Sequence, residues 1–191
     1  LPREVARSVA AIARAGQDLA RMAEKLSHLT RLEEATRVRP GPADMVVVLR
    51  RVVDEQQAAA AARRVGIELS APSAMHATID AALVARAAHE LIVNAVSHAP
   101  LGSRVAVDLV RLDGLLEIRV ADQGQGVPLE DRDRVVLPFE RGENAPGSVS
   151  TSGLGLAVVS AIAAAHGGTV RLDDNEPQGL IARMSLRRHL N

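Results

Sequence analysis

Apolar residues recur every seven positions along the first 35 residues, and this pattern predicts one long helix. Two rows make up the pattern. The first contains Val5, Ile12, Leu19 and Leu26. The second contains Ala15, Met22 and Leu29, each three positions after a residue of the first row. A heptad repeat of this kind buries its apolar seam against other helices. A single helix of this length is not stable alone. Its partner is therefore a helix of another chain, a helix outside this sequence, or the rest of its own domain.

The helical pattern stops at RVRPGPAD, residues 37–44, where two prolines and a glycine follow one another closely. Proline removes a backbone donor and clashes with the preceding turn of a helix, so this stretch breaks it. We predict a boundary near Pro40, between a helical segment of residues 1–36 and a domain of residues 41–191.

Three further helices are predicted by apolar spacing, over residues 44–64, 81–99 and 153–166. Asp80 immediately precedes the second and is a suitable N-cap. Gly167 and Gly168 follow the third, as is common at helix C-termini.

Strands are predicted between these helices. Residues 66–72 and 75–80 read as two short strands around a turn. Residues 103–112 and 115–122 alternate apolar and polar positions and are joined by Asp-Gly, a strong hairpin signal. Two more strands, at 169–174 and 180–188, close the sheet, and residues 123–152 form a polar, irregular stretch. This order predicts an α+β fold in which a mixed sheet carries helices on one face.

The composition excludes several classes of protein. Cysteine is absent, so disulfides and thiolate metal sites are excluded. The net charge is zero and Phe139 is the single aromatic residue, so we expect no nucleic-acid partner. There is no apolar run of about 18 residues and no signal peptide, so we expect a soluble fragment.

The stretch HELIVNAVSHAP, residues 89–100, resembles two known histidine motifs only superficially. A zinc-protease helix needs a second histidine where Val93 stands. The phosphate-accepting motif of two-component kinases has a proline where Asn94 stands. Both readings are therefore excluded.

What remains is a polar row on one helix face, with Glu90 and Asn94 four residues apart and His98 one turn further. A carboxylate and a carboxamide placed in this way are hard oxygen ligands, suited to Mg²⁺ held jointly with nucleotide phosphates. A solvated polar face is the alternative. We expect the opposite face to carry Leu83, Ala87, Leu91 and Ala95 toward the core.

Two glycine-containing stretches strengthen the nucleotide interpretation. Asp122, Gly124 and Gly126 follow a predicted strand; the aspartate can accept a hydrogen bond from an amino group, and the glycines let a flat ligand approach closely. Gly153 and Gly155 begin a predicted helix, whose free N–H groups and dipole favour phosphate. A P-loop is excluded because the single lysine, Lys25, lies in the heptad segment. A dinucleotide fingerprint reads GxGxxG, and it is excluded because Ala157 and Val158 follow GLGL.

These motifs, in this order, resemble the ATP-binding domain of sensor histidine kinases, within the ATPase superfamily shared with gyrase, Hsp90 and MutL. The matching stretches are ELIVNAVSHAP (N box), VADQGQGVP (first glycine box), LPFERG (F box) and TSGLGLAVVSAIAAAHGGTV (second glycine box), covering residues 90–170. LSHLTRLEEA in the first segment also resembles the second helix of the kinases' dimerisation and phosphotransfer bundle. The resemblance implies a two-layer α/β sandwich preceded by one bundle helix.

The resemblance also implies roles for individual residues. Asn94 would coordinate Mg²⁺, with Glu90 as a further ligand or a base, and Asp122 would bind the adenine amino group in a pocket shaped by Gly124 and Gly126. The remaining contacts to ATP would come from His98 and from the lid and its hinge: Phe139, Arg141, Ser152, Gly153, Leu154, Gly155 and Leu156.

The sequence departs from the kinase pattern at several positions. Glu90 stands where these kinases often have asparagine and where gyrase-like hydrolases have their water-activating glutamate. Ser97-His98 replaces a frequent Lys-Tyr, so Arg141 is a substitute phosphate contact, and His98 contacts the nucleotide or caps its own helix. No residue fits the phosphoacceptor histidine: we interpret His28 as an exposed bundle residue and His166 as a structural residue at a helix end, where a cation suits the dipole.

The sequence therefore predicts a catalytic fragment that binds Mg²⁺-ATP and transfers the γ-phosphoryl group to a histidine outside it. The implied partners are the phosphotransfer helix of the same kinase, a response regulator and a second copy in a homodimer. The full-length protein would sit in the cell membrane with this domain on the cytoplasmic side. The alternatives are a hydrolase or Ser/Thr protein kinase using Glu90 as base, and a non-catalytic nucleotide-sensing dimerisation module.

Overall fold

The computed structural model describes residues 37–112, 114–137 and 155–187. The chain divides into two compact units, Leu1–Glu34 and Ala35–Asn191. The first unit lies outside the described residues, so the heptad helix, the role of His28 and the domain limits 1–36 and 41–191 stay predictions.

A five-stranded mixed sheet forms the larger unit's back layer. Its order is β2 (Gly66–Ser70), β4 (Arg104–Leu112), β5 (Leu115–Ala121), β7 (Leu180–Arg187) and β6 (Thr169–Asp174). The pairing of β2 with β4 is parallel, and the other three pairings are antiparallel. The predicted mixed sheet and the β4–β5 hairpin are confirmed.

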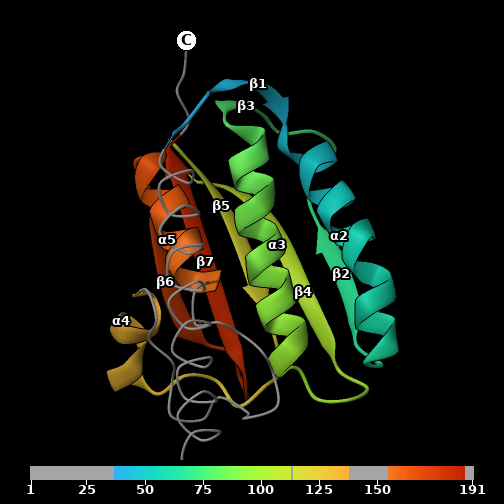
Figure 1. The fold of residues 1–191 in the computed structure, drawn as a ribbon. Coiled ribbons are helices and arrows are strands. Elements are labelled where there is room, and N and C mark those ends of the chain that lie inside the picture. The colour runs from blue at the N-terminus through green and yellow to red at the C-terminus, as the bar shows by residue number, and fades with distance from the viewer. Residues whose placement is uncertain (1–36, 113, 138–154, 188–191) are drawn as a thin grey trace, which may run out of the picture. The chain divides into compact units, whose positions relative to one another are not determined.

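Three helices cover one face of this sheet: α2 (Met45–Ala62), α3 (Ala81–His98) and α5 (Gly155–Ala165). Figure 1 shows them side by side with α3 in the middle, and α3 contacts both neighbours. No helix among the described residues covers the other face, which we call the open face. The predicted α+β sandwich with helices on one face is confirmed. No helix in the described ranges is long and apolar enough to cross a membrane.

The helices begin at side-chain caps and bury their apolar faces. The Asp44 carboxylate accepts a hydrogen bond from the Val46 N–H at 3.0 Å, and Asp80 accepts from the Leu83 N–H at 3.1 Å. On α3, Ala87, Leu91 and Ala95 are buried as predicted, whereas Leu83 is only half-buried. The largest buried side chains between the two layers are Met45, Leu49, Leu91, Ile92, Leu116, Ile118, Ile162, Met184 and Leu186.

The two short strands predicted in residues 66–72 and 75–80 are present, but they do not pair with each other. β2 joins the main sheet beside β4, whereas β3 (His76–Ile79) pairs antiparallel with β1 (Gly41–Asp44) in a separate two-stranded sheet. An alternating pattern indicates which face of a strand is buried but does not name its partner. β1 itself was not predicted, because Pro42 reads as a breaker, yet proline is tolerated in an edge strand.

The first part of the stretch predicted to be irregular contains two short helical elements. A 3₁₀ turn spans Leu129–Asp131 and α4 spans Arg132–Val135. The Arg132 side chain ties them to β6: it donates to the Leu172 carbonyl at 3.3 Å and pairs with Asp174. Four residues are too few to produce a helical period in a sequence, which explains why α4 was missed.

Candidate functional site

One face of α3 carries the polar row that the sequence predicts. Glu90, Asn94 and His98 follow at intervals of four residues, so their side chains lie one above another. All three are partly exposed, whereas Leu91 and Ala95 beside them are buried. The row therefore faces out of the core.

Asp122 lies at the end of β5, on the helix-bearing side of the sheet. Only 5% of it is exposed, and its Oδ1 accepts a hydrogen bond from the Gly124 N–H at 2.7 Å. Burial raises the pKa of Asp122, and the hydrogen bond from Gly124 and the nearby His98 offset part of that rise. A buried carboxylate held in one orientation is suited to accept a hydrogen bond from a flat polar ligand.

Gly124 brings Asp122 and the end of α3 together. A Cβ at Gly124 would lie 2.7 Å from the His98 carbonyl oxygen and 2.8 Å from Asp122 Oδ1. Such distances are too short for any side chain, so only glycine allows the loop to pack here. Gly126 has a φ of +73°, a left-handed conformation that also favours glycine.

Two residues that sequence reasoning missed, Asn175 and Gly179, pack against the backbone carbonyl of Asp122. The Asn175 side chain donates to the Asp122 carbonyl at 2.7 Å, and a Cβ at Gly179 would lie 1.9 Å from that same oxygen. The signal available was the turn-forming run NEPQG, residues 175–179, but nothing in it names Asp122 as the neighbour.

Arg63, also missed, caps the C-terminal end of α3. Its guanidinium donates to the Val96 carbonyl at 3.2 Å and to the Ser97 carbonyl at 2.9 Å. The His98 side chain forms no hydrogen bond with another described residue, so the capping role considered for it belongs to Arg63. His98 stays a predicted nucleotide contact.

The N-terminus of α5 lies against Glu90. A Cβ at Gly155 would be 3.1 Å from Glu90 Oε2, so the carboxylate sits beside the first turn of this helix. Free N–H groups and the helix dipole favour negative charge at this position. Leu156, in the same turn, is half-buried. Phe139, Arg141, Ser152, Gly153 and Leu154 lie outside the described residues, and their roles stay predictions.

His166 is structural, but the reason predicted for it is wrong. It is 2% exposed; its Nδ1 lies 2.8 Å from the Ile162 carbonyl, and its Nε2 lies 3.3 Å from the Asp80 N–H. A carbonyl only accepts and an N–H only donates, so Nδ1 carries the proton and Nε2 accepts. The imidazole acts here as a neutral bridge between α5 and the start of α3, not as a cation at a helix end.

The geometry described above agrees with comparisons to known proteins. Residues 79–190 match the family described as histidine kinase-, DNA gyrase B- and HSP90-like ATPases. The chain belongs to this ATPase family. The four motifs at residues 90–170 fall inside the matched range, so the resemblance to the ATP-binding catalytic domain of sensor histidine kinases is confirmed.

Individual members of the ATPase family show the same likeness. The sensor-like histidine kinase SenX3 of Mycobacterium tuberculosis is 34% identical over 154 residues, which cover 79% of this chain and 37% of SenX3. The structure of the mycobacterial sensor histidine kinase MprB superimposes with a TM-score of 0.69 at 30% identity, covering 78% of this chain and 98% of that one. The ATP-binding domain of PrrB from Mycobacterium tuberculosis gives a TM-score of 0.63 at 26% identity, with 79% and 98% covered. The chain thus spans little more than a third of SenX3.

Proposed function

We propose that this chain is the part of a sensor histidine kinase that binds Mg²⁺-ATP and transfers its γ-phosphoryl group to a histidine outside this fragment. The observation that carries the proposal is the position of Asp122. This buried carboxylate stands beside the His98 end of the row Glu90, Asn94 and His98, while Glu90 stands beside the N-terminus of α5. One molecule with an amino group at one end and phosphates at the other fits that layout.

The adenine end of the ligand would bind at Asp122. Because burial makes the charge of this carboxylate costly, a ligand donor that satisfies it contributes more than it would in water. The amino group of adenine is such a donor. Gly124 lets the loop that carries the carboxylate pack directly against the end of α3, where any side chain would clash, and Gly126 supplies the left-handed backbone conformation that follows.

The phosphate end would bind between Asn94 and the start of α5. Glu90 and the phosphates would repel each other there, since both favour the same helix N-terminus. Mg²⁺, when bound, would offset this repulsion and neutralise charge on the phosphates. The donors fit this ion, because Glu90 and Asn94 offer oxygen.

The chain's own contribution to transfer would be positioning and exclusion of water, as is general for phosphoryl transfer. Asp122 would fix one end of ATP, and Asn94 and the first turn of α5 would orient the other. From the relatives we also propose the partners. They are the phosphotransfer helix of the same kinase and a response regulator, and the full-length protein would be a membrane-bound homodimer.

Calorimetric titration with ATP, with and without Mg²⁺, tests the binding step in wild type and Asn94→Ala. Transfer is then measured by adding labelled ATP to a separately supplied dimerisation and phosphotransfer domain. We expect acid-labile label on that domain with wild type and none with Asn94→Ala. Undiminished transfer by Asn94→Ala would overturn the proposed site. If the wild type binds ATP but transfers no phosphoryl group, the chain is a nucleotide sensor and not a kinase.

A second candidate, an ATP hydrolase or Ser/Thr protein kinase, is favoured by one observation. Glu90 lies where a carboxylate could orient an attacking water or hydroxyl near the phosphates. Steady phosphate release without any acceptor, lost in Glu90→Gln, would favour this candidate over the histidine kinase.

A further inference from the structure

Three arginines stand directly opposite one another on the open face of the sheet. Arg119 of β5 pairs with Arg183 of β7, and Arg183 pairs with Arg171 of β6. Cross-strand partners have Cβ atoms about 4.5–5.5 Å apart and point to the same face, and like charges placed in this way repel. Without counter-charges the row would oppose folding, so the carboxylates beside it decide how much of its charge remains.

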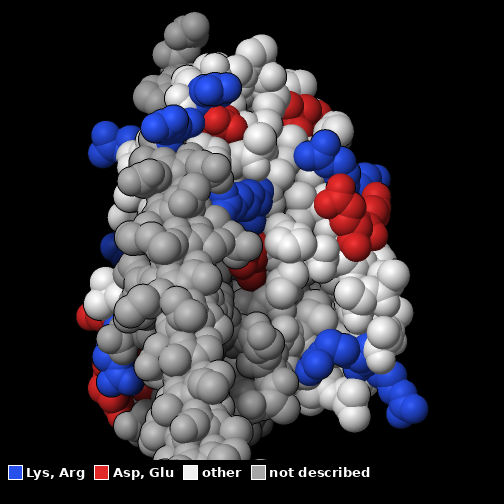
Figure 2. Space-filling model, viewed as in Figure 1, with Lys and Arg blue, Asp and Glu red and all other residues white. Residues whose placement is uncertain are grey.

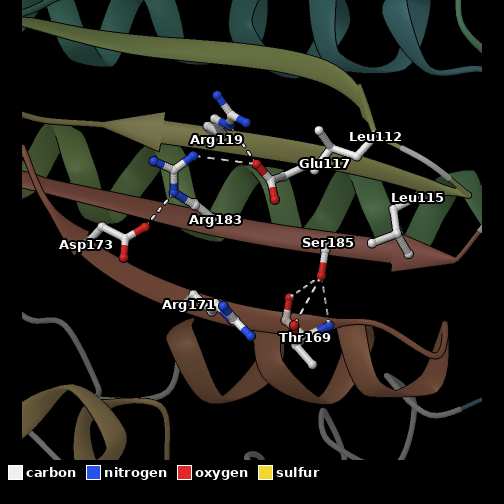
Figure 3. Close-up of a pocket in the computed structure, with 9 residues that line it drawn as sticks. All are labelled: Leu112, Leu115, Glu117, Arg119, Thr169, Arg171, Asp173, Arg183 and Ser185. Carbon is white, nitrogen blue, oxygen red and sulfur yellow. Dashed lines mark hydrogen bonds and ion pairs between the residues drawn. The ribbon is translucent and has the colours of Figure 1, made fainter.

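Carboxylates neutralise the row only in part. Glu117, 9% exposed, accepts from Arg119 Nε at 2.6 Å and lies 3.6 Å from Arg183 Nη1. Arg183 also donates to Asp173 at 2.5 Å, and these contacts raise its pKa. Figure 3 shows Arg171 extended along the sheet with no dashed line to another residue. Arg171 forms no ion pair with any described residue, so one positive charge is left over.

The row lies in a hollow of about 640 Å³ that has distinct ends. Leu112 and Leu115 form an apolar end, and Leu112 is 38% exposed. On the β6 side, the Thr169 and Ser185 hydroxyls lie 3.1 Å apart (Figure 3). Figure 2 shows the helix-bearing side, on which basic and acidic residues are scattered in small groups among uncharged ones.

We propose that this hollow binds an acidic segment of a partner protein. One carboxylate of the segment would pair with Arg171, a second would approach Arg119, and an aliphatic side chain would pack on Leu112 and Leu115. The charge left over at Arg171 supplies the complementarity, and guanidinium groups bind carboxylates in a planar fork. The surface is distinct from Asp122, which lies on the helix-bearing side of the sheet.

Other anions fit the hollow less well. Two strand spacings separate Arg119 from Arg171, about 9.6 Å, which is more than a single phosphate ion spans. Nucleic acid is disfavoured because Glu117 and Asp173 stand within the patch and no aromatic side chain lines it. A polypeptide can place separate carboxylates and an aliphatic group at the required positions.

The test is an NMR titration of the isotope-labelled 191-residue chain with a blocked peptide of alternating Leu-Glu-Ala-Glu. We expect shifts confined to β5, β6, β7 and the Leu112 end of β4, and an affinity about fivefold weaker in Arg171→Ala. The matched control is Arg50→Ala, which removes an exposed arginine of α2 that forms no ion pair with another described residue and should bind like wild type. Arg171→Glu should bind the acidic peptide still more weakly.

Several results would overturn the proposal. The same peptide with glutamine in place of glutamate should shift nothing; equal shifts would rule out charge recognition. Equal weakening by Arg50→Ala would mean diffuse attraction, and equal affinity for inorganic phosphate would mean a small-anion site. ATP titration of Arg171→Ala keeps this test separate from the nucleotide site, because its ATP affinity should equal that of wild type whatever the peptide does.

Discussion

The carbonyl oxygen of His98 lies 2.7 Å from the point where a side chain on Gly124 would begin. Backbone atoms of α3 and of the loop after β5 therefore touch with no room to spare. We expect Gly124→Ala to push the two apart and to weaken ATP binding at least about tenfold, because Asp122 and His98 no longer keep their spacing. Calorimetry measures the affinity.

Gly41→Ala is the matched control for that variant, since nothing lies within 4 Å of a Cβ at Gly41 and its φ is ordinary. It should bind ATP like wild type. Equal binding by both variants would show that the Gly124 contact does not shape the site.

Asp122→Asn should separate binding from stability. Burial raises the pKa of Asp122 above its ordinary 3.8. As pH rises from about 4 through the raised pKa, the folded domain keeps a proton that the unfolded chain has lost, so this carboxyl lowers the free energy of unfolding over that window. Asparagine carries no such charge and still accepts from the Gly124 N–H.

The variant should therefore gain stability relative to wild type between pH 4 and pH 7 while binding ATP more weakly. Urea unfolding at both pH values, with calorimetry at pH 7, checks the two effects. A variant that loses stability relative to wild type as pH rises would contradict the assigned cause.

Glu90→Gln keeps an oxygen donor but removes the charge beside α5. We expect ATP without Mg²⁺ to bind more tightly than to wild type, because the repulsion between carboxylate and phosphates is gone, and the gain on adding Mg²⁺ to shrink. Titrations at several Mg²⁺ concentrations measure both. Unchanged Mg²⁺ dependence with turnover about 10²–10⁴ times lower would identify Glu90 as a base instead.

Glu55→Gln is the control for this experiment. Glu55 is an exposed residue of α2 whose single ion pair with a described residue is the one to Arg51, at 3.8 Å. Its loss should change neither ATP affinity nor the effect of Mg²⁺.

His166→Ala should destabilise the fold through its position between α5 and α3. The change leaves a cavity, removes the partner of the Asp80 N–H and takes one of two donors from the Ile162 carbonyl, which keeps the backbone N–H of residue 166; together these changes cost about 2–4 kcal/mol of unfolding free energy. Urea denaturation measures this. His76→Ala, at an exposed position on β3, should stay close to wild type.

Local features of this fold were predictable and non-local ones were not. The α3 cap at Asp80, the turn between β4 and β5 and the polar row on α3 each depend on neighbours within a few residues. The partner of β2 and the support of Asp122 by Asn175 depend on residues far along the chain. Gly155 can be recognised in the sequence as part of a motif. Its contact with Glu90 cannot, because that contact forms only when α3 and α5 pack together.

The parallel ladder between β2 and β4 has a consequence for how this domain folds. Gly66 pairs with Arg104, and the whole of α3 lies in the loop that this pairing closes. Loop closure over such a length must precede any gain from the ladder, so non-local pairings of this kind form slowly. The β4–β5 hairpin needs no such closure. We expect the hairpin to assemble early and β2 to join late, so that the helix carrying Glu90 and Asn94 takes its final place on the sheet only near the end of folding.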